Sequence, residues 1–205
     1  RSTLFPYTTL FRSVKLGLFV YLILGNVLLS YGMETAFFRF MNKGEQKKKV
    51  QSTALTSLTI SSLVFLLLAY LLRYSIASWL NYDVQYIVFA IYILVLDALV
   101  VIPFAWLRNK GKAKLYAMVK IGNTALNLAL NIYYLNYLSA ENLATNGGVY
   151  YIFLANVIAS LATFIVLLPI YLKIRFKFYY PLWKEMMIYA FPVLLAGIAF
   201  AVNEG

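Results

Sequence analysis

Six long segments of this sequence are almost wholly apolar, and that pattern constrains the fold more than any other feature. A helix needs about 20 mostly apolar residues to cross the hydrocarbon core of a bilayer. The segments span about residues 14–38, 52–72, 84–107, 115–138, 149–172 and 187–205. None of them alternates apolar and polar residues with the period of two that a membrane β-strand shows. We therefore predict an all-α, polytopic transmembrane helical bundle with five full spans and a sixth that the sequence leaves truncated.

The composition excludes a water-soluble globule and several kinds of chemistry. Hydrophobic residues make up 63% of the chain and charged residues 12%, with a mean hydropathy of +0.77, whereas a soluble domain has about 25% charged residues. So few polar side chains cannot cover a globular surface in water. The sequence contains no Cys and no His, which excludes disulfides, thiol chemistry, imidazole catalysis and the common zinc sites. It also lacks a Gly-rich phosphate loop, so we expect no enzyme, no cofactor and no metal site.

Basic residues fall on alternate connections between the predicted spans. Five lie within residues 39–49, four within 108–114 and four within 173–184, whereas the second and fourth connections together hold one, Arg73. By the positive-inside rule, the Lys- and Arg-rich connections are cytoplasmic, and the first span runs inward. The net charge of +11 is then explained by topology and by contact with anionic headgroups, so we expect no nucleic-acid partner.

Aromatic residues gather at the predicted outer edge, between the second and third spans. They are Tyr70, Tyr74, Trp79, Tyr82 and Tyr86. Tyr and Trp are enriched where a membrane meets water, so we interpret the cluster as part of an interfacial belt. A carbohydrate-stacking platform is the alternative.

The N-terminal residues differ in character from the rest of the chain. Residues 3–13, TLFPYTTLFRS, resemble the in-frame translation of a sequencing adapter. We therefore exclude residues 1–13 from the predicted fold as an artefact and treat residues 14–205 as one unit. The alternative is an ordinary amphipathic lead-in helix. Because the chain lacks an initiator Met and stops within an apolar run, we expect a fragment that is open at both ends.

Two ionisable residues lie deep inside predicted spans, where a charge is costly and indicates function. Asp97 lies in the third span and Lys120 in the fourth, both on the cytoplasmic side of the midplane. An ion pair between them is possible and would lock two helices together. The alternative is a cationic lining for an anionic substrate, with Asp97 orienting Lys120 or exchanging its proton.

Glu34 and Arg39 flank the inner end of the first span. Because they are five residues apart, they do not share a helix face, and each is expected to reach another helix.

Asparagines form a polar stripe next to Lys120. Asn123, Asn127 and Asn131 recur every four residues along one face of the fourth span, and Asn156 in the fifth span is placed to face them. Such a stripe either bonds a neighbouring helix or lines a water-filled cavity. We favour the cavity, because gluing two helices together requires fewer polar groups.

Three segments carry a resemblance to a known family. They are YGMETAFFRF (residues 31–40), LDALVVIPFAWLR (96–108) and YAFPVLLAGIAFAVNE (189–204). Together they resemble the polysaccharide (O-antigen-type) flippases of the MOP exporter superfamily, whose fold is MATE-like, and the resemblance covers residues 14–205. It implies a bacterial inner-membrane protein of twelve to fourteen helices in two lobes, of which this chain supplies part of the N-terminal lobe. The implied activity is transfer of a polyprenyl-diphosphate-linked oligosaccharide between leaflets by alternating access.

The resemblance also implies roles for the polar residues. Arg39 and Lys120 would contact phosphate, while Glu34 and Asp97 would orient these cations or couple transport to H⁺ or Na⁺. The sugar hydroxyls would be bound by the amides of Asn123, Asn127, Asn131 and Asn156.

Two other functions stay open. A cation-coupled multidrug exporter of the same superfamily would favour acidic groups in its cavity. A non-transporting membrane scaffold would bury the polar stripe against another helix. A cleft bordered by Lys120, Asn123 and Asn127 would argue against the scaffold.

Overall fold

The computed structural model describes residues 6–43, 46–137 and 140–204, and these residues are all-helical, without a strand. The predicted all-α class is therefore confirmed. The helices are α1 (Pro6–Ser30), α2 (Met33–Lys43), α3 (Lys47–Leu71), α4 (Arg73–Leu80), α5 (Val84–Asn109), α6 (Ala113–Tyr137), α7 (Ala140–Lys173) and α8 (Tyr180–Glu204). Residues 1–5 lie outside the described part. The backbone of residues 6–13 belongs to α1, so the adapter interpretation stays a prediction.

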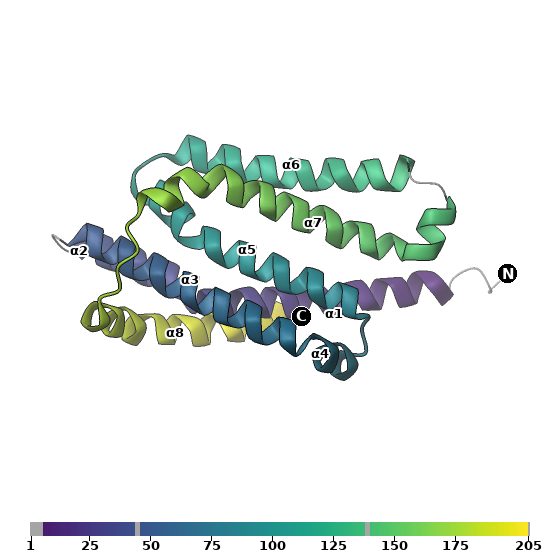
Figure 1. Ribbon diagram of the computed structural model, residues 1–205, viewed down its shortest axis with the longest axis horizontal. Coiled ribbons are helices and arrows are strands. Elements are labelled where there is room, and N and C mark those ends of the chain that lie inside the picture. Colours follow the sequence, from purple (N-terminus) through teal and green to yellow (C-terminus); the bar gives the residue numbers. More distant parts are fainter. Residues whose placement is uncertain (1–5, 44–45, 138–139, 205) are drawn as a thin grey trace.

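The long helices lie side by side, with α5 at the centre (Figure 1). Helix α5 packs against α1, α3 and α7, while α6 packs mainly on α7. Helix α8 lies against α1, α2 and α3 on the other side of the bundle. This leaves α6 at the periphery, with one flank on α7 and the other open.

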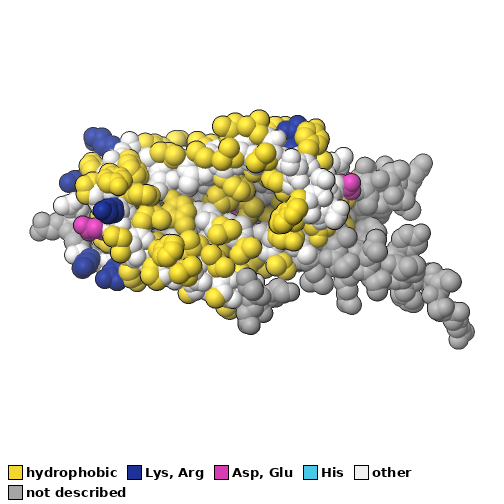
Figure 2. All heavy atoms as spheres, turned by 90° about the horizontal axis from the view of Figure 1, so that it is seen from below, with side chains coloured by type: hydrophobic (Ala, Val, Ile, Leu, Met, Phe, Trp, Pro, Cys, Tyr) yellow, Lys and Arg dark blue, Asp and Glu magenta, His cyan; other side chains and the backbone are white. Residues whose placement is uncertain are grey.

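Five helical segments are long and apolar enough to cross a membrane within the described ranges. They are Gly17–Lys43, Lys47–Leu71, Val84–Asn109, Val149–Lys173 and Tyr180–Ala201. Large apolar side chains point outward from them, as lipid-facing residues do, and Figure 2 shows hydrophobic side chains along the flank with most of the visible Lys and Arg at one end. The chain therefore has the character of a multi-pass membrane protein.

Helix α6 coincides with the predicted fourth span in position but differs from the other spans in composition. It is 25 residues long, which is sufficient to cross a bilayer, yet it is less apolar than the five segments named above and is not among them. Its two lysines and four asparagines lower its hydropathy. This is the helix on which a polar lining was predicted.

The predicted first span is divided into two helices instead of forming one. Tyr31 (φ 34°) and Gly32 (φ 69°) take left-handed backbone conformations between α1 and α2. A Cβ at Gly32 would lie 2.6 Å from the carbonyl oxygen of Ala190, so the close approach of α8 admits only glycine there. An apolar run does not reveal such a break, because the packing of a distant helix determines it.

A hydrogen-bonded group holds the break in place. The Tyr31 hydroxyl and the Ser57 hydroxyl lie 2.7 Å apart, and the Trp183 indole donates to Ser57 at 2.9 Å. Three elements, the break, α3 and α8, thus meet at Ser57. Beyond the break, α2 buries Met33 and Phe37 completely in a core shared with α3, α5 and α8. This packing fixes the face of α2 that carries Glu34.

The predicted aromatic cluster surrounds α4, at the end of the bundle opposite α2 (Figure 1). The guanidinium of Arg73 lies over the rings of Tyr70 and Tyr74, at 4.2 and 4.6 Å. Trp79 is 80% exposed. The arrangement suits an amphipathic segment at a membrane surface.

Candidate functional site: a polar cavity between α5, α6 and α7

A polar cavity of about 430 Å³ opens among five helices. Most of the side chains that line it are polar or charged, although all but those of α6 project from helices long and apolar enough to span a membrane. The lining residues are Asn26, Val27 and Ser30 of α1, Glu34 of α2, Asp97, Val100, Val101, Phe104 and Arg108 of α5, Tyr116, Lys120 and Asn123 of α6, and Asn156, Ser160 and Thr163 of α7. Five of the eight predicted site residues therefore meet here: Glu34, Asp97, Lys120, Asn123 and Asn156.

Asp97 and Lys120 share the cavity, but their side chains do not form the ion pair that was one alternative. The Asp97 carboxylate accepts a hydrogen bond from the Ser160 hydroxyl of α7 at 2.9 Å. The Lys120 ammonium lies 4.6 Å from the centre of the Phe104 ring. Within the described ranges, the only ion pair joins other residues, so the positive charge of Lys120 is not neutralised by a carboxylate in contact with it.

That ion pair joins Glu34 of α2 to Arg108 of α5, with 2.7 Å between the carboxylate oxygen and the guanidinium nitrogen. Both side chains are roughly half exposed, at 41% and 49%, and a pair of this kind contributes at most about 1 kcal/mol to stability. Arg108 also lies over the rings of Phe38 and Tyr116. The pair therefore positions a cation at the α5 C-terminal end of the cavity more than it stabilises the fold.

Arg39 does not line the cavity, so its predicted contact with phosphate stays a prediction. Its guanidinium lies 4.1 Å from the centre of the Tyr189 ring on α8. Since Glu34 contacts α5 instead, the expectation that these two residues reach different helices is confirmed. Among the residues that line the cavity, the arginine is Arg108.

Of the three asparagines in the stripe on α6, one lines the cavity and two do not. Asn123 donates to the Thr163 hydroxyl of α7 at 2.8 Å and lines the cavity. Asn131 donates to the side-chain and backbone oxygens of Asn127 at 2.7 and 2.8 Å, and neither of these two residues lines the cavity. Asn127 and Asn131 bond each other further along α6 and do not line this cavity, so their binding role stays a prediction.

Several lining residues were missed although the sequence contains their signal. Arg108 was treated only as a topology marker, yet it lies eleven residues after Asp97, which is three helical turns and hence the same face. On α7, Ser160 and Thr163 follow Asn156 at spacings of four and seven residues, again on one face. Asn26, Ser30 and Glu34 are also spaced every four residues, although the break between α1 and α2 lies between Ser30 and Glu34.

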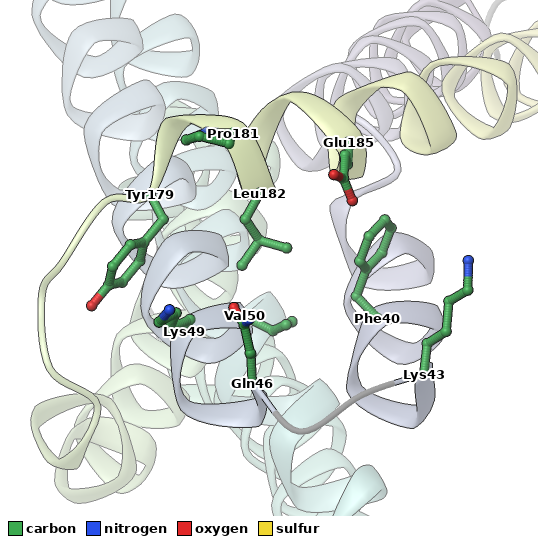
Figure 3. A pocket seen from close by; sticks show the side chains of 9 residues that line it. All are labelled: Phe40, Lys43, Gln46, Lys49, Val50, Tyr179, Pro181, Leu182 and Glu185. Carbon is green, nitrogen blue, oxygen red and sulfur yellow. The ribbon is translucent and has the colours of Figure 1, made fainter.

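A second hollow lies at the end of the bundle where α2, α3 and α8 meet, and Figure 3 shows it from close by. Its volume is about 660 Å³, and its lining residues are Phe40, Lys43, Gln46, Lys49, Val50, Tyr179, Pro181, Leu182 and Glu185. The Lys49 ammonium lies 5.4 Å from the centre of the Tyr179 ring. No predicted site residue lines it, and its lysines belong to the basic end of the bundle, where they suit contact with headgroups. We therefore take the polar cavity as the candidate site.

No model of a known protein family matches the chain, and neither does any curated protein or solved structure. The chemistry of the cavity is therefore the basis for a functional argument. Lys120 and Arg108 supply positive charge for an anionic group. The amides and hydroxyls around them supply donors and acceptors for a ligand rich in hydroxyl groups.

Proposed function

We propose that the chain belongs to a flippase that moves a polyprenyl-diphosphate-linked oligosaccharide across a bacterial inner membrane by alternating access. On this proposal the protein is a transporter and not an enzyme, and its Lys- and Arg-rich connections face the cytoplasm. The resemblance of three sequence segments to the O-antigen-type flippases of the MOP superfamily motivates the proposal.

One observation carries the proposal: the Lys120 ammonium lies in a cavity formed by membrane helices, with no carboxylate in contact. A lysine inside a membrane span is costly unless water or an anion meets it. Asn123 and Asn156 line the same cavity, so an anionic group at Lys120 would have neutral hydrogen-bonding groups beside it. A diphosphate linked to sugars combines these two chemistries in one ligand.

The break between α1 and α2 supports a protein that changes conformation. Interrupted helices next to a central site are typical of transporters that alternate between two states. Glu34 lies two residues after the break and contacts Arg108 across the cavity end. Motion at Tyr31 and Gly32 would therefore change the geometry of the cavity directly.

A cation-coupled exporter is the second candidate, and Asp97 is the observation that favours it. Its carboxylate lies in the cavity and is held by Ser160, as expected for a group that binds H⁺ or Na⁺. The scaffold alternative is less well supported, because a cavity of about 430 Å³ differs from the dry, helix-packed stripe that a scaffold predicts.

Complementation of a flippase-deletion strain tests the proposal. Lys120→Gln, introduced into the gene that encodes this chain, is expected to abolish or strongly reduce surface polysaccharide. Lys114→Gln is the matched control, because Lys114 lies on the same helix, is exposed and does not line the cavity. Wild-type polysaccharide with both variants would contradict the phosphate-binding role, and altered drug resistance with normal polysaccharide would favour the exporter.

A further inference from the structure

A groove on the far side of the α6–α7 contact adjoins the polar cavity. Its volume is about 340 Å³, and its lining residues are Leu115, Met118, Val119, Gly122, Asn123, Leu126, Ala159, Ala162, Thr163 and Val166. All of these are apolar or glycine except Asn123 and Thr163. These two residues also line the polar cavity, so the two hollows meet at the same pair of side chains.

The hydrogen bond between Asn123 and Thr163 is the boundary between the two hollows. Asn123 donates to the Thr163 hydroxyl at 2.8 Å, and that hydroxyl donates to the Ala159 carbonyl at 3.0 Å. The polar groups of the pair thus bond each other and the backbone, leaving the groove wall apolar. On α6, Tyr116 and Lys120 face the cavity while Met118 and Gly122 face the groove, as helical periodicity requires.

The groove has free room and opens outward. A Cβ at Gly122 would meet no atom within 4 Å, and Met118 is 69% exposed. Each wall contains small residues, which are Gly122 on α6 and Ala159 and Ala162 on α7. An apolar groove on the flank of a membrane helix is filled by hydrocarbon, since water there would be unfavourable.

We propose that this groove holds the hydrocarbon chain of the same amphiphile whose anionic group lies at Lys120. The inference rests on the proposed function and makes it more specific, because it identifies α6 and α7 as the side by which a long-chain isoprenoid phosphate or diphosphate enters from the bilayer. Lys120 and Gly122 are two residues apart and lie on opposite faces of α6, but Asn123 and Thr163 line both the cavity and the groove. A head group in the cavity and the first part of its chain in the groove would therefore be adjacent at this pair, with the chain passing over it.

Photolabelling in nanodiscs of phosphatidylcholine tests this placement. The probe is an isoprenoid diphosphate with a diazirine in its chain, and diazirine-labelled phosphatidylcholine serves as the reference lipid. We expect the diphosphate probe to label the groove residues of α6 and α7, and excess unlabelled isoprenoid diphosphate to suppress that labelling. Equal labelling by the reference lipid, without suppression, would show that bulk lipid covers the groove and would overturn the inference.

Two tryptophan variants on α6 separate the groove from the rest of the helix surface. Gly122→Trp fills the groove and is expected to reduce labelling about tenfold. The indole would expel at least two CH₂ groups of the probe's chain from the groove, and losing the burial of two CH₂ groups weakens binding by about that factor. Ile121→Trp is the matched control, because Ile121 is 67% exposed and lines neither hollow. Gly122→Leu provides a smaller filling side chain should the Trp variant fail to fold. Unchanged labelling in the folded Gly122 variants would overturn the inference.

Lys120→Gln distinguishes failure of this inference from failure of the proposed function. Loss of labelling in both Lys120→Gln and Gly122→Trp supports the head-and-chain placement. Loss of labelling in Lys120→Gln but not in Gly122→Trp overturns the assignment of the groove and leaves the anion site in the cavity standing. Labelling that neither variant reduces overturns both proposals.

Discussion

The carboxylate of Glu34 and the guanidinium of Arg108 lie 2.7 Å apart and join α2 to α5 at one end of the polar cavity. Glu34 thereby balances one of the two cations that line the cavity, whereas Lys120 has no carboxylate in contact. Removing the acid or the base of this pair should therefore change anion binding in opposite directions.

Glu34→Gln should tighten the binding of inorganic diphosphate, and Arg108→Gln should weaken it. The expected change is about 2–5-fold in each direction, which is the scale of a partly exposed ion pair. Isothermal titration of the purified protein measures it, with Glu185→Gln as a control, because this exposed acid lies on α8 outside the cavity. A change of the same sign in both variants would contradict the assignment of Arg108 as an anion-binding residue.

Asp97 and Ser160 should be energetically coupled across the α5–α7 contact. A hydrogen bond from a hydroxyl to a carboxylate is worth about 1.5–3 kcal/mol, so Asp97→Asn and Ser160→Ala should show a coupling energy of that size in a double-mutant cycle of thermal unfolding. Additive effects of the two substitutions would mean that the bond of 2.9 Å does not hold Asp97 in place.

Gly32→Ala should destabilise the protein much more than Gly122→Ala. A left-handed backbone costs a non-glycine residue about 1–2 kcal/mol, and the added Cβ would approach the Ala190 carbonyl to 2.6 Å. Gly122 lies within α6 with open space around it, and alanine there should gain up to about 1 kcal/mol of helix stability. Thermal unfolding in detergent compares the two, and equal effects would be incompatible with a backbone break at Gly32.

Asparagines inside and outside the cavity should differ in their effect on transport. Asn156→Ala removes a cavity hydrogen-bonding group, whose loss costs about 0.5–1.5 kcal/mol or 2–10-fold in apparent affinity for the oligosaccharide. Asn131→Ala should leave affinity unchanged, since Asn131 bonds Asn127. The concentration dependence of transport provides the measurement; a larger loss for Asn131→Ala would place the sugar site elsewhere along α6.

Features governed by local periodicity could be predicted from the sequence. The apolar runs predicted the long helices, and the polar groups of α5, α6 and α7 predicted a shared cavity containing Asp97, Lys120 and Asn123. The features that the sequence pattern did not predict depend on which partner a side chain or backbone group contacts. Helix α8 imposes the break at Gly32, and Asn131 donates to Asn127 one turn earlier on α6 and not to a group in the cavity. Arg39 lies over the ring of Tyr189 on α8, a contact between segments far apart in the sequence.

Transport in proteoliposomes provides a direct test of the proposed role of Lys120. The protein expressed from the complete gene would be reconstituted with a fluorescent isoprenoid-diphosphate-linked oligosaccharide, and the fraction accessible on the outer surface measured over time. We predict that Lys120→Gln abolishes movement of this lipid between leaflets, while Lys114→Gln transports at the wild-type rate. Wild-type transport by Lys120→Gln would contradict the claim that Lys120 binds the diphosphate.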